Sequence, residues 1–355
     1  MRRAVLASLL LGAFAASPAR GAATLEPVDV FTLSWVGDMA FSSDRGLPAG
    51  GIGAALGPIR YYLRADIVTG NLEGTLTTGG ASKCGKRRRR SVQHAGDCFA
   101  FRAPPSYAQG LRRIGFDLLN QANNHANDFG PTGQAQTTAA LNAAGIAYTG
   151  RPGQITTIKV AHTRVGFVGF APYPWASPLL DIPAAAALVR KAKETNDLVV
   201  VMMHQGAEGA GALHVPFGTE TAFGENRGNA RAFTHAMIDA GAGLVLGSGP
   251  HVIRGVERYK HHLIAYSLGN FAGPHTLGIG GVTALSGVLR LQLTSEGDVL
   301  GGRFVPIRVV SPGVPRFDGS GASIRQVQRL SRADFHSRYA LFSDGRIGRD
   351  PAARR

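Results

Sequence analysis

Runs of apolar residues that end in polar residues recur along this chain of 355 residues. Five of these runs predict strands, at residues 30–36, 66–69, 116–119, 198–203 and 244–246. Four stretches between them predict helices, at residues 106–114, 131–144, 183–194 and 230–240. Continuous apolar strands that alternate with helices are typical of a sheet covered on both faces.

Three further segments predict antiparallel hairpins, at residues 157–170, at 252–266, and from 282–293 through a turn at 295–298. Together with the alternating units, these hairpins indicate an α/β fold with two packed sheets flanked by helices. The glycine-rich residues 205–229 are expected to form a long loop near the site, and the polar, basic residues 343–355 a loose tail.

The first 21 residues have the pattern of a secretory signal peptide. Arg2 and Arg3 precede an uncharged run at residues 4–16, which is too short for a spanning helix of about 20 apolar residues. We therefore expect export to the periplasm or the extracellular space, and an uncleaved anchor is the alternative. The rest of the chain is expected to form one large domain, residues 29–311, and a partly disordered C-terminal extension, residues 312–355.

Composition narrows the class of protein further. A hydrophobic share of 44% supports a large core and excludes a disordered chain, and two cysteines are too few for a disulfide scaffold. The formal charge of +15 favours an anionic partner such as a polyanionic polymer. We expect no nucleic acid as a partner, because an exported chain rarely meets it and no aromatic-rich binding motif accompanies the arginines.

The two cysteines, Cys84 and Cys98, flank a basic run at residues 86–90. In an oxidising compartment they can form a disulfide, which is worth about 3 kcal/mol for a loop of this size in the chain-entropy model. Two free thiols are the alternative. The basic run is expected to be a solvated loop, with binding of a polyanion as the alternative.

Polar side chains cluster where the apolar runs end, and the carboxyl ends of strands are where α/β sheets bind their ligands. The set contains only carboxylate, imidazole and carboxamide groups: Asp38, Asn71, Glu73, Asn123, Asn124, His125, Asp128, His204, Glu208, His251 and Asn270. Such groups suit Zn, Mn or Fe. An ion of this kind can turn water into a nucleophile at neutral pH.

Six short motifs occur in order along the chain. They are Gly37-Asp38, Asn71-Leu72-Glu73, Ala122-Asn123-Asn124-His125 with Asp128-Phe129-Gly130, His204-Gln205-Gly206 with Glu208, Gly247-x-x-Pro250-His251-Val252, and Tyr266-Ser267-Leu268-Gly269-Asn270-Phe271. Each is weak alone. As a set, which covers about residues 31–271, they resemble the CapA family of poly-γ-glutamate capsule synthesis proteins.

That family is similar to the calcineurin-like metallophosphoesterases. The resemblance therefore implies a four-layer αββα sandwich of two mixed sheets, with one or two divalent ions (Mn, Zn or Fe) at the strand ends. It implies His125 as general acid and five metal ligands: Asp38, Glu73, Asn124, His204 and His251. The other polar residues would bind substrate or orient the ligands: Asn71, Asn123, Asp128, Glu208 and Asn270.

The sequence departs from that pattern at three places. Met39 and Ala40 follow Asp38 where metallophosphoesterases usually have Asp-x-His, and Gln205 stands where a tryptophan is usual. Ser248 or Gly249 occupies a position that often holds a histidine. Each loss removes a ligand or a wall of the pocket, so one ion is expected rather than two.

The sequence leaves two functions open. The first is an exported, metal-dependent hydrolase of the phosphoesterase type, acting on a phosphoester or an anionic polymer in capsule, poly-γ-glutamate or cell-envelope metabolism. The second is a non-catalytic accessory protein that binds an anionic polymer or a membrane synthase complex. Each candidate residue also has a structural alternative: Asp38 as a cap, the asparagines as turn residues, and the histidines as hydrogen-bonded core groups.

Overall fold

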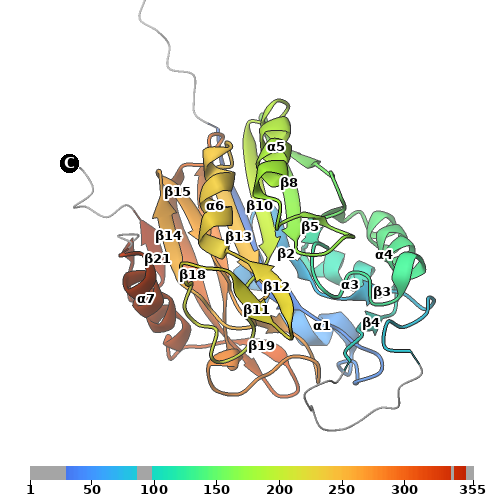
Figure 1. Cartoon of the computed structure of the whole chain (residues 1–355). Helices are drawn as coiled ribbons and strands as arrows, with labels where there is room; N and C mark the ends of the chain where they lie inside the picture. Colours follow the sequence, from blue (N-terminus) through green and yellow to red (C-terminus); the bar gives the residue numbers. More distant parts are fainter. Residues whose placement is uncertain (1–28, 86–97, 337–339, 349–355) are drawn as a thin grey trace, which may run out of the picture.

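The computed structural model describes residues 29–85, 98–336 and 340–348 (Figure 1). The expected signal peptide at residues 1–21 and the basic run at residues 86–90 lie outside the described residues. Among the helices of the described part, none combines the length and the apolar character needed to cross a membrane.

The larger of two main sheets has ten strands and is mixed. Its strands are β1 (Val30–Met39), β2 (Ile67–Leu72), β5 (Leu118–Asn120), β6 (Ala147–Thr149), β16 (Asn270–Ala272), β17 (Leu285–Thr294), β18 (Val299–Val310), β19 (Val314–Phe317), β20 (Ala340–Leu341) and β21 (Arg346–Gly348). The central strand β1 is parallel to β2 and β16 and antiparallel to β17. The parallel neighbours place the carboxyl ends of β1 and β2 side by side.

The smaller sheet has seven strands and is also mixed. Its strands are β7 (Thr156–Val160), β8 (Thr163–Ala171), β9 (Ser177–Pro178), β10 (Leu198–His204), β13 (Leu244–Ser248), β14 (Val256–Tyr259) and β15 (His262–Ala265). The strands β8, β10, β13 and β15 are parallel, and β7 and β14 pair antiparallel at the two edges. The three predicted hairpins are thereby confirmed, including β17 with β18.

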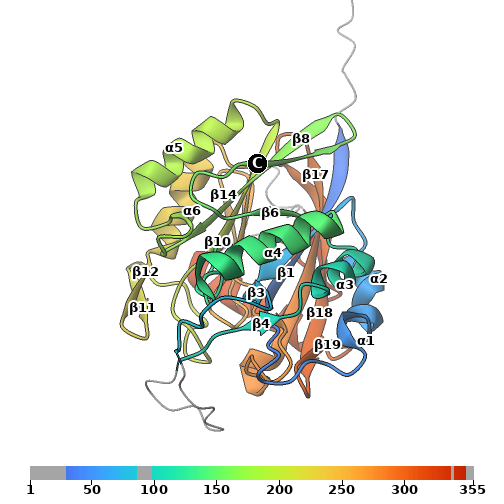
Figure 2. The same ribbon diagram turned by 90° about the vertical axis from the view of Figure 1, so that its right-hand side faces the viewer.

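Seven α-helices of the described chain lie outside the two sheets: α1 (Gly51–Leu56), α2 (Arg60–Leu63), α3 (Tyr107–Ile114), α4 (Gly130–Ala144), α5 (Ile182–Lys193), α6 (Ala230–Asp239) and α7 (Ala322–Phe335). The first four pack on the larger sheet, and α5 and α6 pack on the smaller one (Figures 1 and 2). The last helix, α7, packs against β14, β17 and β18. All four predicted helices are confirmed to within a residue at each end.

A hydrophobic core lies between the two sheets, so the layers follow in the order helices, sheet, sheet and helices. Trp35 of β1, Phe167 of β8 and Met202 of β10 are buried together there, while Val36 of β1 faces the helices on the outer side. Because successive side chains of a strand point to opposite faces, one apolar run can fill two cores. The predicted αββα sandwich of two mixed sheets is therefore confirmed.

Two expectations about loops need correction. Residues 205–229 are not wholly irregular, because they contain an antiparallel hairpin of β11 (Glu220–Ala222) and β12 (Glu225–Gly228). The expected loose tail from residue 343 is wrong for β21, which pairs with β18 of the larger sheet. Apolar Ile347 is 7% exposed, so its burial outweighs the polar character of its neighbours.

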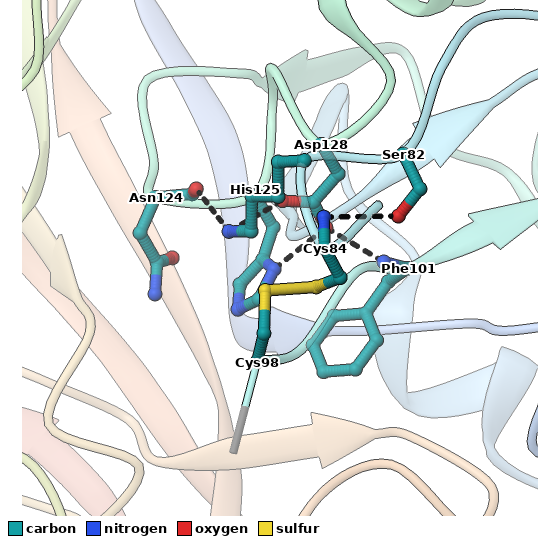
Figure 3. The surroundings of a disulfide bond; sticks show 8 residues. Ser82, Cys84, Cys98, Phe101, Asn124, His125 and Asp128 are labelled. Carbon is teal, nitrogen blue, oxygen red and sulfur yellow. Dashed lines mark hydrogen bonds and ion pairs between the residues drawn. A yellow bond between two sulfur atoms is a disulfide. The ribbon is translucent and has the colours of Figure 1, made fainter. Parts of the chain in front are cut away.

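Two short strands, β3 (Thr75–Leu76) and β4 (Arg102–Ala103), pair in parallel. They bring together the two ends of the segment that contains the cysteines. Cys84 and Cys98 are joined in a disulfide, so the predicted bridge is confirmed and the alternative of two free thiols is wrong. The bridge fixes these two chain segments beside the loop that carries Asn124 and His125 (Figure 3).

Candidate metal centre at the strand ends

Three side chains from both sheets converge at the carboxyl ends of the strands. Asp38 lies near the end of β1, Glu73 follows β2 directly, and His251 follows β13 with a φ of 58°. One potential ligand atom from each lies within 4.8 Å of the others. The predicted clustering of these three residues is therefore present, although Asp38 belongs to the strand rather than to the turn after it.

Glu73 gives the clearest indication of a cation. Its side chain is completely buried, and neither carboxylate oxygen has a hydrogen-bond partner among the described residues. Burial raises its pKa well above the usual value. A buried carboxylate without donors is costly, and a cation between Glu73, Asp38 and His251 would compensate it. The residues present therefore fit a divalent metal ion.

His204 lies beside the same carboxylates. Its Nε2 atom is 3.7 Å from Oε1 of Glu73 and has no hydrogen-bond partner in the described chain, and its Nδ1 atom is 3.2 Å from Oγ of Ser248. Burial lowers the pKa of His204 to about 3. The imidazole is therefore neutral near neutral pH, which is the form that binds metals.

His251 lies between the two carboxylates. Its Nδ1 atom is 3.2 Å from Oδ2 of Asp38, and its Nε2 atom is 3.6 Å from Oε1 of Glu73. Burial lowers its pKa, but the carboxylates of Glu73 and Asp38 outweigh burial and raise it to about 10. The two carboxylates thus favour the imidazolium form of His251.

Asparagine side chains hold the cluster in place. Asn71 donates to Oδ1 of Asp38 at 2.8 Å, and its own Oδ1 accepts from Asn120 and Asn123. Asn270 contacts Nδ1 of His251 at 2.9 Å through Oδ1 and donates to two backbone carbonyls. Contacts of this kind can orient metal ligands, and the substrate-binding or orienting roles of these asparagines stay predictions.

His125 and Asp128 form a second buried pair near the disulfide (Figure 3). Nδ1 of His125 is 2.7 Å from Oδ2 of Asp128, and the ring stacks on Phe101 with centroids 4.2 Å apart. Burial lowers the pKa of His125, while the Asp128 carboxylate opposes that shift. In Asn124, next to His125, the Oδ1 atom is buried without a hydrogen-bond partner among the described residues.

Glu208 links the cluster to a residue that no sequence pattern singles out. Its Oε2 atom is 3.6 Å from Nε2 of His251, and its Oε1 atom is 2.7 Å from Nη1 of Arg227 in β12. The side chain of Arg227 is only 2% exposed. Two further residues were missed: Lys83, whose only signal was its place beside Cys84, and Trp175, which donates to the backbone oxygen of Asn123.

Of the candidate positions for the missing histidines, Ser248 and Gly249 contact the cluster, and Ala40 does not offer a ligand. Ser248 contacts His204, and the backbone nitrogen of Gly249 donates to Oδ2 of Asp38 at 3.4 Å. Ala40 is fully buried and offers no ligand atom. Within the described residues a single group of three metal-ligating side chains is present, and the number of ions stays a prediction.

Fold and site together define a four-layer α/β sandwich with a carboxylate–histidine cluster at the strand ends. The model of the family described as bacterial capsule synthesis protein PGA_cap matches residues 32–274. The chain belongs to this family, as the motifs predicted.

Several relatives are similar over part of their length. Capsule biosynthesis protein CapA of Bacillus anthracis is 28% identical over 233 residues, which are 59% of this chain and 51% of that protein. A protein of Mycobacterium tuberculosis (strain ATCC 25618 / H37Rv), named "probable polyglutamine synthesis accessory protein", is 28% identical over 296 residues, 76% of this chain and 69% of its own. The chain thus spans about half the length of the first of these relatives.

Two solved structures also resemble the chain. A hypothetical protein from Thermus thermophilus has a TM-score of 0.42 and 20% identity, covering 80% of this chain and 96% of that one. A 5'-nucleotidase precursor from the same organism has a TM-score of 0.40 and 13% identity, covering 86% and 59%. Likenesses this distant carry no conclusion about activity.

Proposed function

We propose that this protein is a metal-dependent hydrolase of the phosphoesterase type that acts in capsule, poly-γ-glutamate or cell-envelope polymer metabolism. The observation that carries the proposal is the buried carboxylate of Glu73, which lacks hydrogen-bond partners beside Asp38, His204 and His251. Asp38, Glu73, His204 and His251 would hold the ion, and Asn124 would complete the set. A divalent ion bound there would supply Lewis-acid chemistry at neutral pH.

The protein's own residues would handle the proton of the leaving group. Asp128 accepts from Nδ1 of His125, which leaves Nε2 of that ring as the atom that can carry a proton to the substrate. Asp128 also stabilises the imidazolium form of His125, while burial makes its proton easier to give up. His125 would thus act as general acid, and the phosphoester oxygen of the leaving group would receive the proton.

A non-catalytic accessory role is the second candidate. Ala40, and either Ser248 or Gly249, stand where metallophosphoesterases often have histidine, and a reduced site can bind an ion or a polymer without hydrolysis. The name of the M. tuberculosis relative supports the same candidate. In this case the partner would be an anionic polymer or a membrane synthase complex. Export to the periplasm or cell surface belongs to both candidates.

The test begins with metal-depleted protein and calorimetric titration of Mn²⁺ and Zn²⁺. We expect one high-affinity ion, and we expect Asp38→Asn to weaken its binding by about 100-fold or more. The loaded protein is then assayed on aryl phosphomonoesters, aryl phosphodiesters and poly-γ-glutamate. The hydrolase candidate predicts turnover that His125→Ala reduces by about 10²- to 10⁴-fold.

His214→Ala is the matched control, since His214 also pairs with an aspartate, Asp334, at 2.6 Å, but outside the cluster. Its turnover should equal that of the unmodified protein. Tight binding of poly-γ-glutamate without turnover of any substrate would replace the hydrolase by the accessory candidate. Failure of both ions to bind would contradict the metal site itself.

A further inference from the structure

Lys83 makes three contacts with the loop that carries His125. Its Nζ atom is 2.6 Å from Oδ1 of Asp128 and 3.3 Å from the backbone oxygen of Asn124. Its backbone nitrogen donates to the backbone oxygen of Asp128 at 2.8 Å. The side chain is 37% exposed, whereas that of Asp128 is completely buried, so Lys83 brings a positive charge from the surface to a buried carboxylate.

The two oxygens of Asp128 have different partners. Oδ2 accepts from the backbone nitrogen of Phe101 at 2.6 Å and contacts Nδ1 of His125. Oδ1 has no hydrogen bond from the described residues and is compensated by the ion pair with Lys83. Removal of Lys83 would leave one oxygen of a buried carboxylate uncompensated, which favours rotation of Asp128 away from His125.

The disulfide connects the two chain segments that contact the pair of His125 and Asp128 (Figure 3). Cys84 adjoins Lys83, which contacts Oδ1 of Asp128, and Cys98 lies three residues before Phe101, which contacts Oδ2 and stacks on the His125 ring. The bridge therefore covalently connects the segments that carry Lys83 and Phe101, two of the three partners of the Asp128 carboxylate. A link of this kind limits how far Lys83 and Phe101 can separate.

We propose that Lys83 is a positioning residue for His125, that it acts through Asp128, and that the Cys84–Cys98 bridge keeps it in place. This inference rests on the proposed function, in which His125 protonates the leaving group. A general acid matters most when the leaving group is a poor one. The contribution of Lys83 should therefore depend on the leaving group, whereas a purely structural contribution would not.

The test compares phenyl phosphate with p-nitrophenyl phosphate, and the corresponding diaryl phosphates, in the Mn²⁺-loaded protein. Lys83→Met should reduce kcat by about tenfold or more with the phenyl esters and by less than about twofold with the nitrophenyl esters. Lys83→Arg should restore most of the loss, because it keeps the charge. The Cys84→Ser/Cys98→Ser variant should show the same dependence with a smaller loss, since the backbone bond from Lys83 to Asp128 remains.

Lys260→Met is the matched control. Lys260 also forms an ion pair of 2.6 Å, with Asp239, but both partners are largely exposed, with Lys260 in the turn between β14 and β15 and Asp239 at the end of α6. Lys260→Met should leave kcat unchanged with the phenyl esters and with the nitrophenyl esters. An equal loss with both leaving groups in Lys83→Met, or a loss that Lys83→Arg does not restore, would overturn the inference while leaving the hydrolase proposal intact.

Proton NMR of the metal-free protein provides a readout that needs no turnover. The Nδ1 proton of His125 in its bond to Asp128 should give a downfield signal, assigned by its loss in His125→Gln. We expect Lys83→Met to remove or broaden this signal and to leave that of His235, which is 3.0 Å from Glu257, unchanged. An unchanged His125 signal would overturn the inference even if the protein proves to have no hydrolase activity.

Discussion

Two buried glutamates of this protein, Glu220 and Glu73, differ in the hydrogen-bond partners of their carboxylates. Both oxygens of Glu220 are satisfied, since Oε2 accepts from Nη1 of Arg254 at 3.0 Å and Oε1 accepts from Nη2 of Arg254 and the backbone nitrogen of Ala207. Both oxygens of Glu73 are buried without a hydrogen-bond partner among the described residues. Folding therefore supplies hydrogen-bond donors to the first carboxylate and none, among the described residues, to the second.

The difference separates a structural carboxylate from a functional one. Glu220 and Arg254 fasten the 205–229 segment to the loop after β13, so their charges are paired as soon as the chain folds. Glu73 lies where two sheets meet and faces Asp38, which has the same charge. Such an arrangement is unfavourable for the protein alone and becomes favourable once a cation binds.

The largest effect that we expect is the loss of stability caused by a substitution of Glu220. Glu220→Gln should lower the free energy of unfolding by about 3–5 kcal/mol, because it leaves the charge of Arg254 buried without its partner. Urea denaturation followed by circular dichroism measures the change. Arg112→Met is the control, since Arg112 pairs with Asp117 nearer the surface and should cost less than about 1 kcal/mol. Equal losses in the two variants would contradict the structural role of Glu220.

The same substitution at Glu73 should weaken metal binding and should not reduce stability. Glu73→Gln should not lower the free energy of unfolding of the metal-free protein, because it replaces a buried carboxylate that accepts no hydrogen bond from the described residues. It should weaken Mn²⁺ or Zn²⁺ binding by about 100-fold or more, or about 2.8 kcal/mol. Urea denaturation and calorimetric titration of one preparation measure both quantities. A large loss of stability with unchanged metal affinity would make Glu73 structural and remove the distinction from Glu220.

The smallest expected effect concerns a third buried glutamate, Glu257, and is a dependence of the free energy of unfolding on pH. Burial raises the pKa of Glu257, but hydrogen bonds from His235 and Tyr266 outweigh burial and lower it below 4.5. The stability that Glu257 contributes is therefore fully present above pH 4.5 and is lost as pH falls through its lowered pKa.

Glu257→Gln should accordingly be less stable than the unmodified protein above pH 4.5, with a gap that narrows as the pH falls below that value. Urea denaturation over a series of pH values measures the gap. Glu296→Gln, in the exposed turn between β17 and β18, is the control and should show no gap at any pH. A gap that widens in acid would mean that the hydrogen bonds of Glu257 do not favour its charged form.

Much of the fold could be predicted because local pattern and final environment agree. The apolar run at residues 198–203 became β10, which ends at His204, and the structure buries all seven residues of the strand between two layers. Pro183 and the side chain of Asp181 mark the start of α5, where Asp181 accepts from the backbone nitrogen of Ala184. The exceptions, β21 and the β11–β12 hairpin, are short strands whose partners lie far away in the sequence or within a glycine-rich segment.

Much of the site could be predicted for a different reason, since chemistry-bearing residues follow strands whose ends meet. Lys83 and Arg227 were missed because a lone basic residue in a loop or a short hairpin has no local pattern, and their importance comes from Asp128 and Glu208, which are distant in sequence. The metal ligation by Asp38, Glu73, Asn124, His204 and His251, and the role of His125, stay predictions.

The amino-acid sequence by itself determined the alternation of strands and helices, the family, and which side chains could bind a metal ion, because these depend on residue type and spacing along the chain. Only the tertiary structure decided which of those side chains face one another and which carboxylates are buried without hydrogen-bond donors among the described residues. The physical reason is that the cost of a buried charge depends on its neighbours in space. Those neighbours come from both sheets, with Asp38 and His251 more than two hundred residues apart in the sequence yet 3.2 Å apart in the fold.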